Sequence, residues 1–111
     1  MVVEQFAFYK LNEVDSIITL GKLVKAQVIF LFGSKEFICN KEVFNKIKIT
    51  YPNADIIGCT TAGEIFNDQV NDNILTVTAV YFESTKIKFL VTELTDFNKC
   101  YEKGIEIAKA I

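Results

Sequence analysis

The stretch AQVIFLFGS, residues 26–34, decides the fold class. Its first seven residues form an almost unbroken apolar run rich in residues that favour strands, and Gly33-Ser34 ends it. Such a run predicts a strand that is buried on both faces, as in a parallel sheet covered by helices. The stretch therefore indicates an α/β protein, and the residues around it supply the other elements.

Alternating strand and helix patterns flank this run. Val2 to Tyr9 is apolar and aromatic and predicts a first strand, and apolar residues at helical spacing predict a helix over residues 12–25. Asn40 can cap a second helix, which must end before Pro52 because the residue preceding a proline avoids helical dihedral angles. Residues 54–59 then predict a further short apolar strand.

The C-terminal half predicts a hairpin and a last helix. Residues 74–82 and 86–94 alternate in polarity and are joined by Glu83-Ser84-Thr85, which favours two antiparallel strands. Asp96 can cap a final helix that runs to Ile111. The predicted order is β-α-β-α-β-β-β-α in a single domain, residues 1–111. Strands joined by helices should be parallel, which gives a mixed sheet with helices packed on it.

Composition argues against several classes of function. The net charge is −2 and all twelve basic residues are lysines, so neither nonspecific nucleic-acid binding nor bidentate recognition of phosphate by arginine is expected. The longest apolar run is too short to span a membrane, and the N-terminus lacks the basic region of a signal peptide. Three cysteines without a C-x-x-C pair favour a reduced, cytoplasmic setting. The absence of histidine removes the usual general base and metal ligand, so we expect no enzyme, metal or cofactor.

Two segments follow the predicted parallel strands, where open sheets bind ligands. The first is Gly33-Ser34-Lys35, and the second is GCTTAGE, residues 58–64. Glycines allow close backbone approach and positive φ, threonines offer hydroxyls, and the lysine and glutamate offer opposite charges. The combination suits a small polar ligand such as an amino acid. The candidate ligand-binding residues are Gly33, Ser34, Gly58, Cys59, Thr60, Thr61, Ala62, Gly63 and Glu64.

Each of these residues also has a purely structural interpretation. The GCTTAGE loop could be a tight turn whose threonines bond to their own backbone. Cys59 could be a nucleophile, but the simpler hypothesis is a small buried cysteine at the end of a strand. For Cys39 and Cys100 the simplest interpretation is that they pack in the protein interior. Glu64 could contact a ligand or could be a solvated carboxylate. The acidic segment 67–73 lacks the spacing of a calcium loop and predicts a solvated loop.

A longer run resembles a known family. The sequence DIIGCTTAGEI, residues 55–65, preceded by YPNA and by the strand before Gly33-Ser34, resembles the N-terminal part of the FIST domain. Thr60 stands where the family commonly has serine, so the hydroxyl is kept. The resemblance implies a sensory domain of a bacterial signal-transduction protein that binds small ligands, with a signalling output domain as partner. Some members are linked to haem sensing through histidine, but this sequence contains no histidine to carry that role.

The resemblance further implies a domain longer than this chain. The last helix has no C-cap, and half of the residues are apolar, which favours surface made for a partner. The remainder of the FIST domain is one expected partner and a second copy is another. The alternative function is therefore an interaction or dimerisation module without a small ligand, in which GCTTAGE is only structural.

Overall fold

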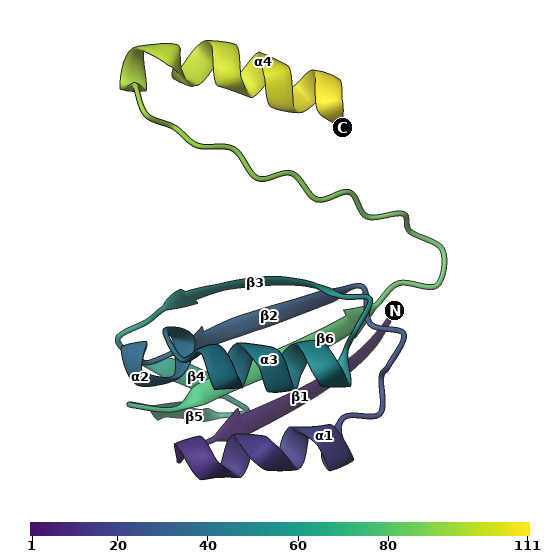
Figure 1. Ribbon diagram of the computed structural model, residues 1–111, viewed down its shortest axis with the longest axis vertical. Helices are drawn as coiled ribbons and strands as arrows, with labels where there is room; N and C mark the ends of the chain where they lie inside the picture. Colours follow the sequence, from purple (N-terminus) through teal and green to yellow (C-terminus); the bar gives the residue numbers. More distant parts are fainter.

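The computed structural model describes residues 1–111 and has a four-stranded mixed sheet in the order β1-β6-β2-β3 (Figure 1). β2 and β3 are parallel neighbours, whereas β6 is antiparallel to both β1 and β2. The strands are β1 (Val2–Phe8), β2 (Val28–Gly33), β3 (Asp55–Thr60), β4 (Glu64–Phe66), β5 (Gln69–Asn71) and β6 (Leu75–Tyr81). The helices are η1 (Leu11–Ser16), α1 (Ile17–Leu20), α2 (Lys35–Ile38), α3 (Lys41–Thr50), η2 (Phe97–Lys99) and α4 (Cys100–Ala110), where η marks a 3-10 turn. The mixed α/β class is thus confirmed.

The core lies between one face of the sheet and the helices α1 to α3, which Figure 1 shows on the same side. Ile29 and Leu31 of β2 pack in this core with Val77 of β6 and with Ile47 of α3. The other face is only partly covered, as Phe32 shows by keeping 39% of its surface exposed. The prediction that the second strand is buried on both faces is therefore wrong at its C-terminal end. The covered face is called the inner face below, and the opposite one the outer face.

The first helical region is shorter than the pattern over residues 12–25 predicts. η1 and α1 together end at Leu20, and Gly21 adopts an extended conformation with ψ of 117°. A Cβ on Gly21 would lie 2.4 Å from Cγ2 of Thr50, so this position serves the close approach of α3. The second helix is confirmed, since the Asn40 side chain accepts the N–H of Glu42 at 2.9 Å as an N-cap.

The segment predicted as a solvated acidic loop, residues 67–73, is largely exposed as expected, but it forms part of a hairpin. β4 and β5 pair antiparallel, with Glu64 opposite Asn71 and Phe66 opposite Gln69. Asn67, in the turn between them, has a φ of 56°, which asparagine tolerates better than most residues. The chain thus contains an antiparallel hairpin, but at residues 64–71.

The hairpin predicted between residues 74–82 and 86–94 is wrong. β6 forms as expected, but residues 86–94 belong to no strand, and the chain after Phe82 runs away from the sheet to η2 and α4 (Figure 1). Asp96 caps η2 by accepting the N–H of Asn98 at 2.9 Å, which confirms the start of the last helical region. No helix of the structure combines the length and the apolar character that crossing a membrane requires.

Candidate functional site

The two glycine-containing segments lie side by side at one end of the sheet, as the strand pattern predicts. Gly33 at the end of β2 is the register partner of Thr60 at the end of β3, and the N–H of Thr61 donates to the Gly33 carbonyl at 3.0 Å. The N–H of Ser34 donates to the carbonyl of Ile74 at 3.2 Å, just before β6 begins. The carboxyl ends of β2 and β3 therefore meet the segment that leads into β6.

Close backbone packing explains the glycines at this end of the sheet. A Cβ on Gly33 would lie 2.6 Å from the carbonyl oxygen of Ile74, and one on Gly58 would lie 2.5 Å from that of Leu31. Neither distance is compatible with a real side chain. No glycine has a positive φ, so Gly58 and Gly63 do not use the left-handed conformations that glycine allows. Gly33 and Gly58 therefore serve close approach of the backbone.

Glu64 is the most buried polar residue of the loop, with 3% of its surface exposed. The hydroxyl of Thr61 donates to its Oε1, and the N–H of Ile74 points at its Oε2 from 3.5 Å. Glu64 therefore links the loop after β3 to the chain entering β6, and the interpretation of a solvated carboxylate is wrong. Buried carboxylates need such partners, because an unpaired charge in the protein interior is costly.

Two buried side-chain atoms in this region have no hydrogen-bond partner in the protein: Oγ of Ser34 and Nδ2 of Asn71. Ser34 directly follows Gly33 at the end of β2. Asn71 is the register partner of Glu64 in the hairpin. Sequence reasoning missed Asn71, because only the pairing of β4 with β5 brings it to the loop. The Ser34 hydroxyl, which can donate or accept, and the Asn71 amide N–H groups, which donate, are thus left without partners.

The remaining residues of the loop are exposed. Cys59, Thr60, Ala62 and Gly63 face solvent, and Cys59 makes no side-chain hydrogen bond. The prediction of a buried cysteine is therefore wrong at Cys59. Cys39 and Cys100, which were predicted to pack in the interior, are exposed as well, so this prediction is also wrong.

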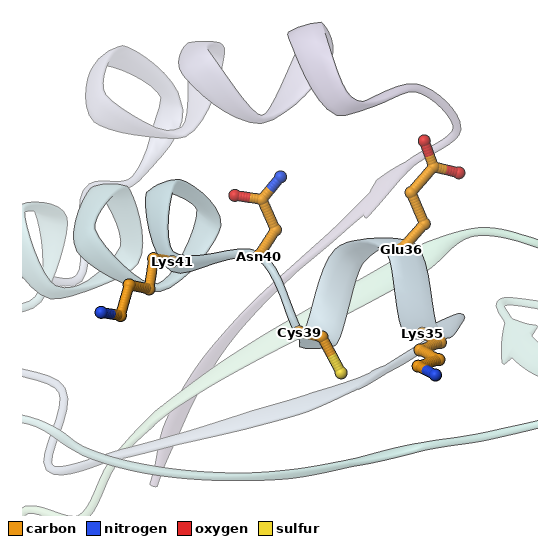
Figure 2. Close-up of a pocket in the computed structure, with 5 residues that line it drawn as sticks. All are labelled: Lys35, Glu36, Cys39, Asn40 and Lys41. Atoms are coloured by element: carbon orange, nitrogen blue, oxygen red, sulfur yellow. The ribbon is translucent and has the colours of Figure 1, made fainter.

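A shallow hollow lies next to the site, over α2 and the start of α3. It is lined by Lys35, Glu36, Cys39, Asn40 and Lys41. Figure 2 shows that these side chains point in different directions, with Glu36 and Asn40 on one side and Cys39 on the other. Lys35 therefore contributes its charge to an open surface, and the buried polar groups of the site come from Ser34, Glu64 and Asn71. No group of three or more cysteine, aspartate or glutamate side chains is placed so that it could hold a metal ion.

The arrangement gathers polar groups that can form hydrogen bonds and carry charge. It offers a buried carboxylate, a hydroxyl and an amide at the junction of β2, β3 and the β4–β5 hairpin. The side-chain hydrogen bond within it joins the Thr61 hydroxyl to the Glu64 carboxylate.

Comparison with known proteins identifies the family of this chain. The family model described as the FIST N domain matches residues 27–111, which begins just before β2 and includes the whole candidate site. No curated protein and no solved structure matches the chain. The chain belongs to the FIST family, whose domains generally act as sensory domains of signalling proteins.

Proposed function

We propose that this chain is a sensory domain that binds a small polar ligand, such as an amino acid, at the GCTTAGE loop. The observation that carries the proposal is that two buried atoms of this region, Ser34 Oγ and Asn71 Nδ2, have no partner, while the Glu64 carboxylate is buried. Unpaired buried polar groups are rare in folded proteins because each forfeits a hydrogen bond. A ligand carboxylate can accept from a hydroxyl or from an amide N–H, and a ligand ammonium can donate to Glu64.

A signal requires two states that the ligand distinguishes. In the state described here Glu64 accepts from Thr61, which joins the hairpin to the end of β3. A ligand ammonium that takes over this carboxylate releases the Thr61 hydroxyl and changes how β4 is held. We propose that this change passes to an output domain in the cytoplasm of a bacterial cell, either directly or through the remainder of a longer FIST domain.

Thermal unfolding of the full chain with a panel of amino acids and related polar metabolites tests the proposal. A ligand that binds the folded state raises the melting temperature. Ser34→Ala removes a hydroxyl that has no partner in the protein, so it should abolish the ligand-induced shift while leaving the unliganded melting temperature nearly unchanged. Asn45→Ala, an exposed change on α3, is the matched control. The proposal fails if no compound raises the melting temperature, or if Ser34→Ala binds as the parent does.

An interaction module is the second candidate. Exposed apolar side chains favour it, among them Phe32 and Ile57 on the outer face, with 39% and 41% of their surfaces exposed. This reading does not need the loop to bind anything. It predicts concentration-dependent association of the chain and no melting-temperature shift with any metabolite.

A further inference from the structure

We infer that the β4–β5 hairpin, residues 62–73, is a lid that opens as a unit and so gives a ligand access to the buried groups of the candidate site. Polar atoms that solvent does not reach are out of reach of a ligand as well. Glu64 keeps 3% of its surface exposed, and Nδ2 of Asn71 is buried. The hollows of the structure are lined by other residues, so the state described here is closed. Opening is a property of the fold alone, whereas its role in admitting a ligand rests on the proposed function.

Both ends of the lid are held at the end of β2. The N–H of Thr61 donates to the Gly33 carbonyl at 3.0 Å, and the N–H of Ser34 donates to the Ile74 carbonyl at 3.2 Å. Because Gly33 and Ser34 are consecutive residues, the lid begins and ends at neighbouring points, at the end of the sheet where Figure 1 shows the hairpin. These two hydrogen bonds are called the clamps. The segment between them can move without breaking a pairing of the main sheet.

Few contacts hold the lid between the clamps. β4 and β5 pair only with each other, and no backbone hydrogen bond outside this pairing involves residues 62–73. The side-chain hydrogen bonds of the lid all end on the Glu64 carboxylate, which accepts from the Thr61 hydroxyl and faces the N–H of Ile74 at 3.5 Å. A two-stranded hairpin is only marginally stable by itself in water. The Thr61–Glu64 hydrogen bond is therefore the latch of the lid.

The two faces of the lid have the opposite polarity to that of a hairpin held by a hydrophobic core. Register partners share one face of an antiparallel pair, and the next partners lie on the other face. Glu64 and Asn71 are one such pair, whereas Ile65 and Val70, the next pair, keep 71% and 74% of their surfaces exposed. Phe66 is the one apolar side chain of the lid that is partly buried. Apolar burial thus contributes little to closure, and Nδ2 of Asn71 gains a hydrogen bond to water when the lid opens.

The residues next to the clamps are suited to act as hinges. Gly63 is exposed, and Asn73 has a φ of 58°, a conformation that few residues other than glycine adopt. A Cβ on Gly63 would lie 3.2 Å from Oδ1 of Asp72, so the two segments that connect the lid to the sheet lie side by side. Hinge motions are changes of φ and ψ at a few such positions. The lid can therefore turn about one narrow base.

Thiol labelling of the full chain without any ligand measures this opening. The three native cysteines are exposed and are replaced by serine. Asn71→Cys then places a thiol on the covered face of the lid, and Val70→Cys places one on the exposed face as the control. Excess thiol reagent should label Asn71→Cys about tenfold or more slowly than Val70→Cys, because labelling waits for local opening.

Urea and a latch variant separate lid opening from global unfolding. Opening exposes little surface, so the labelling rate of Asn71→Cys should stay nearly constant in urea below the unfolding transition. Adding Thr61→Val removes the latch donor and should raise this rate about tenfold or more, while Thr60→Val leaves it unchanged. The inference is overturned if the rate follows global unfolding in urea, if it equals that of Val70→Cys, or if Thr61→Val does not change it.

Hydrogen exchange gives a second test that keeps the covered face unsubstituted. Lid opening separates the N–H of Ile74 from Glu64 but leaves the N–H of Ser34 in its clamp. Thr61→Val should therefore speed exchange at Ile74 and leave the exchange of Ser34 unchanged, and equal acceleration at both amides would contradict a lid. Since no ligand is present, this outcome is independent of the proposed function, whose failure is the absence of any ligand-induced shift in melting temperature.

Discussion

The hydroxyl of Tyr51 donates a 2.6 Å hydrogen bond to Oε1 of Glu4, which joins the end of α3 to the edge strand β1. The same carboxylate accepts the N–H groups of Lys22, at 3.1 Å, and Leu23, at 2.9 Å. Tyr51 is fully buried, and a Cβ on Gly21 would lie 2.8 Å from its hydroxyl. Glu4 therefore holds together β1, the turn after α1 and the end of α3.

Removing the Tyr51 hydroxyl should weaken the fold. Tyr51→Phe deletes one buried hydrogen bond to a charged acceptor, so it should lower the free energy of unfolding by about 1–3 kcal/mol in urea denaturation. Tyr81→Phe is the control, since the Tyr81 hydroxyl makes no hydrogen bond. A Tyr51→Phe protein as stable as the Tyr81→Phe protein would show that the bond to Glu4 contributes nothing.

Alkaline pH should act through the same tyrosine. Burial first, and then the hydrogen bond and charge of Glu4, raise the pKa of Tyr51 well above its ordinary value of 10.0. The folded protein then keeps a proton that the unfolded chain loses, so the free energy of unfolding is highest below pH 10 and falls as the pH rises beyond it. Urea denaturation on both sides of that pH should give a smaller alkaline loss for Tyr51→Phe than for the parent. Equal losses in the two proteins would contradict this assignment.

The two glycines of β3 and α4 should respond oppositely to a methyl group. Gly58→Ala places a Cβ 2.5 Å from the Leu31 carbonyl, so the two strands must separate, at a cost of roughly 1–3 kcal/mol of unfolding free energy. A Cβ on Gly104 meets nothing within 4 Å, and Gly104→Ala should stabilise α4 by about 0.5–1 kcal/mol. Thermal melts report the first effect and far-UV circular dichroism the second. A Gly58→Ala protein that melts with the parent would be inconsistent with this packing.

Neighbouring threonines offer a matched test of the Glu64 contact. Thr61→Val leaves a buried carboxylate without its hydroxyl donor and should cost about 1–3 kcal/mol of unfolding free energy. Thr60→Val changes an exposed side chain that makes no hydrogen bond and should change stability by about 0.5 kcal/mol at most. If the two variants unfold alike, Thr61 does not hold Glu64.

Local sequence patterns predicted most of the helices and strands, but not which of them contact one another in the fold. The Asn40 cap and the β2 run are short-range signals, and both were predicted correctly. Residues 86–94 alternate like a strand, yet alternation specifies only which side chains share a face, and the backbone there has no partner within the chain. Residues 12–25 continue the helical spacing past Gly21, but close packing of that glycine on Thr50 and Tyr51 ends the helix early.

The proximity of the two glycine-containing segments was predictable from the sequence, whereas the burial of Glu64 was not. The ends of β2 and β3 could be placed together because parallel neighbours finish at the same edge. The burial of Glu64 could not, since it depends on a hydrogen bond from Thr61 and on a hairpin that brings Asn71 opposite. Cys59 follows an apolar run and was expected inside, but its alternation with Gly58 sends it to the uncovered outer face.

The one-sided pairing of β3 gives this strand two kinds of amide. The N–H groups of Asp55, Ile57 and Cys59 lie inside the sheet, whereas those of Ile56, Gly58 and Thr60 meet solvent. Amide hydrogens along a single strand should therefore exchange with water alternately slowly and quickly, although every residue belongs to the same rigid element. A segment that pairs with this edge will slow hydrogen exchange at Ile56, Gly58 and Thr60 and leave the exchange of the other set unchanged. The first set therefore serves as an internal reference for whether the edge is covered.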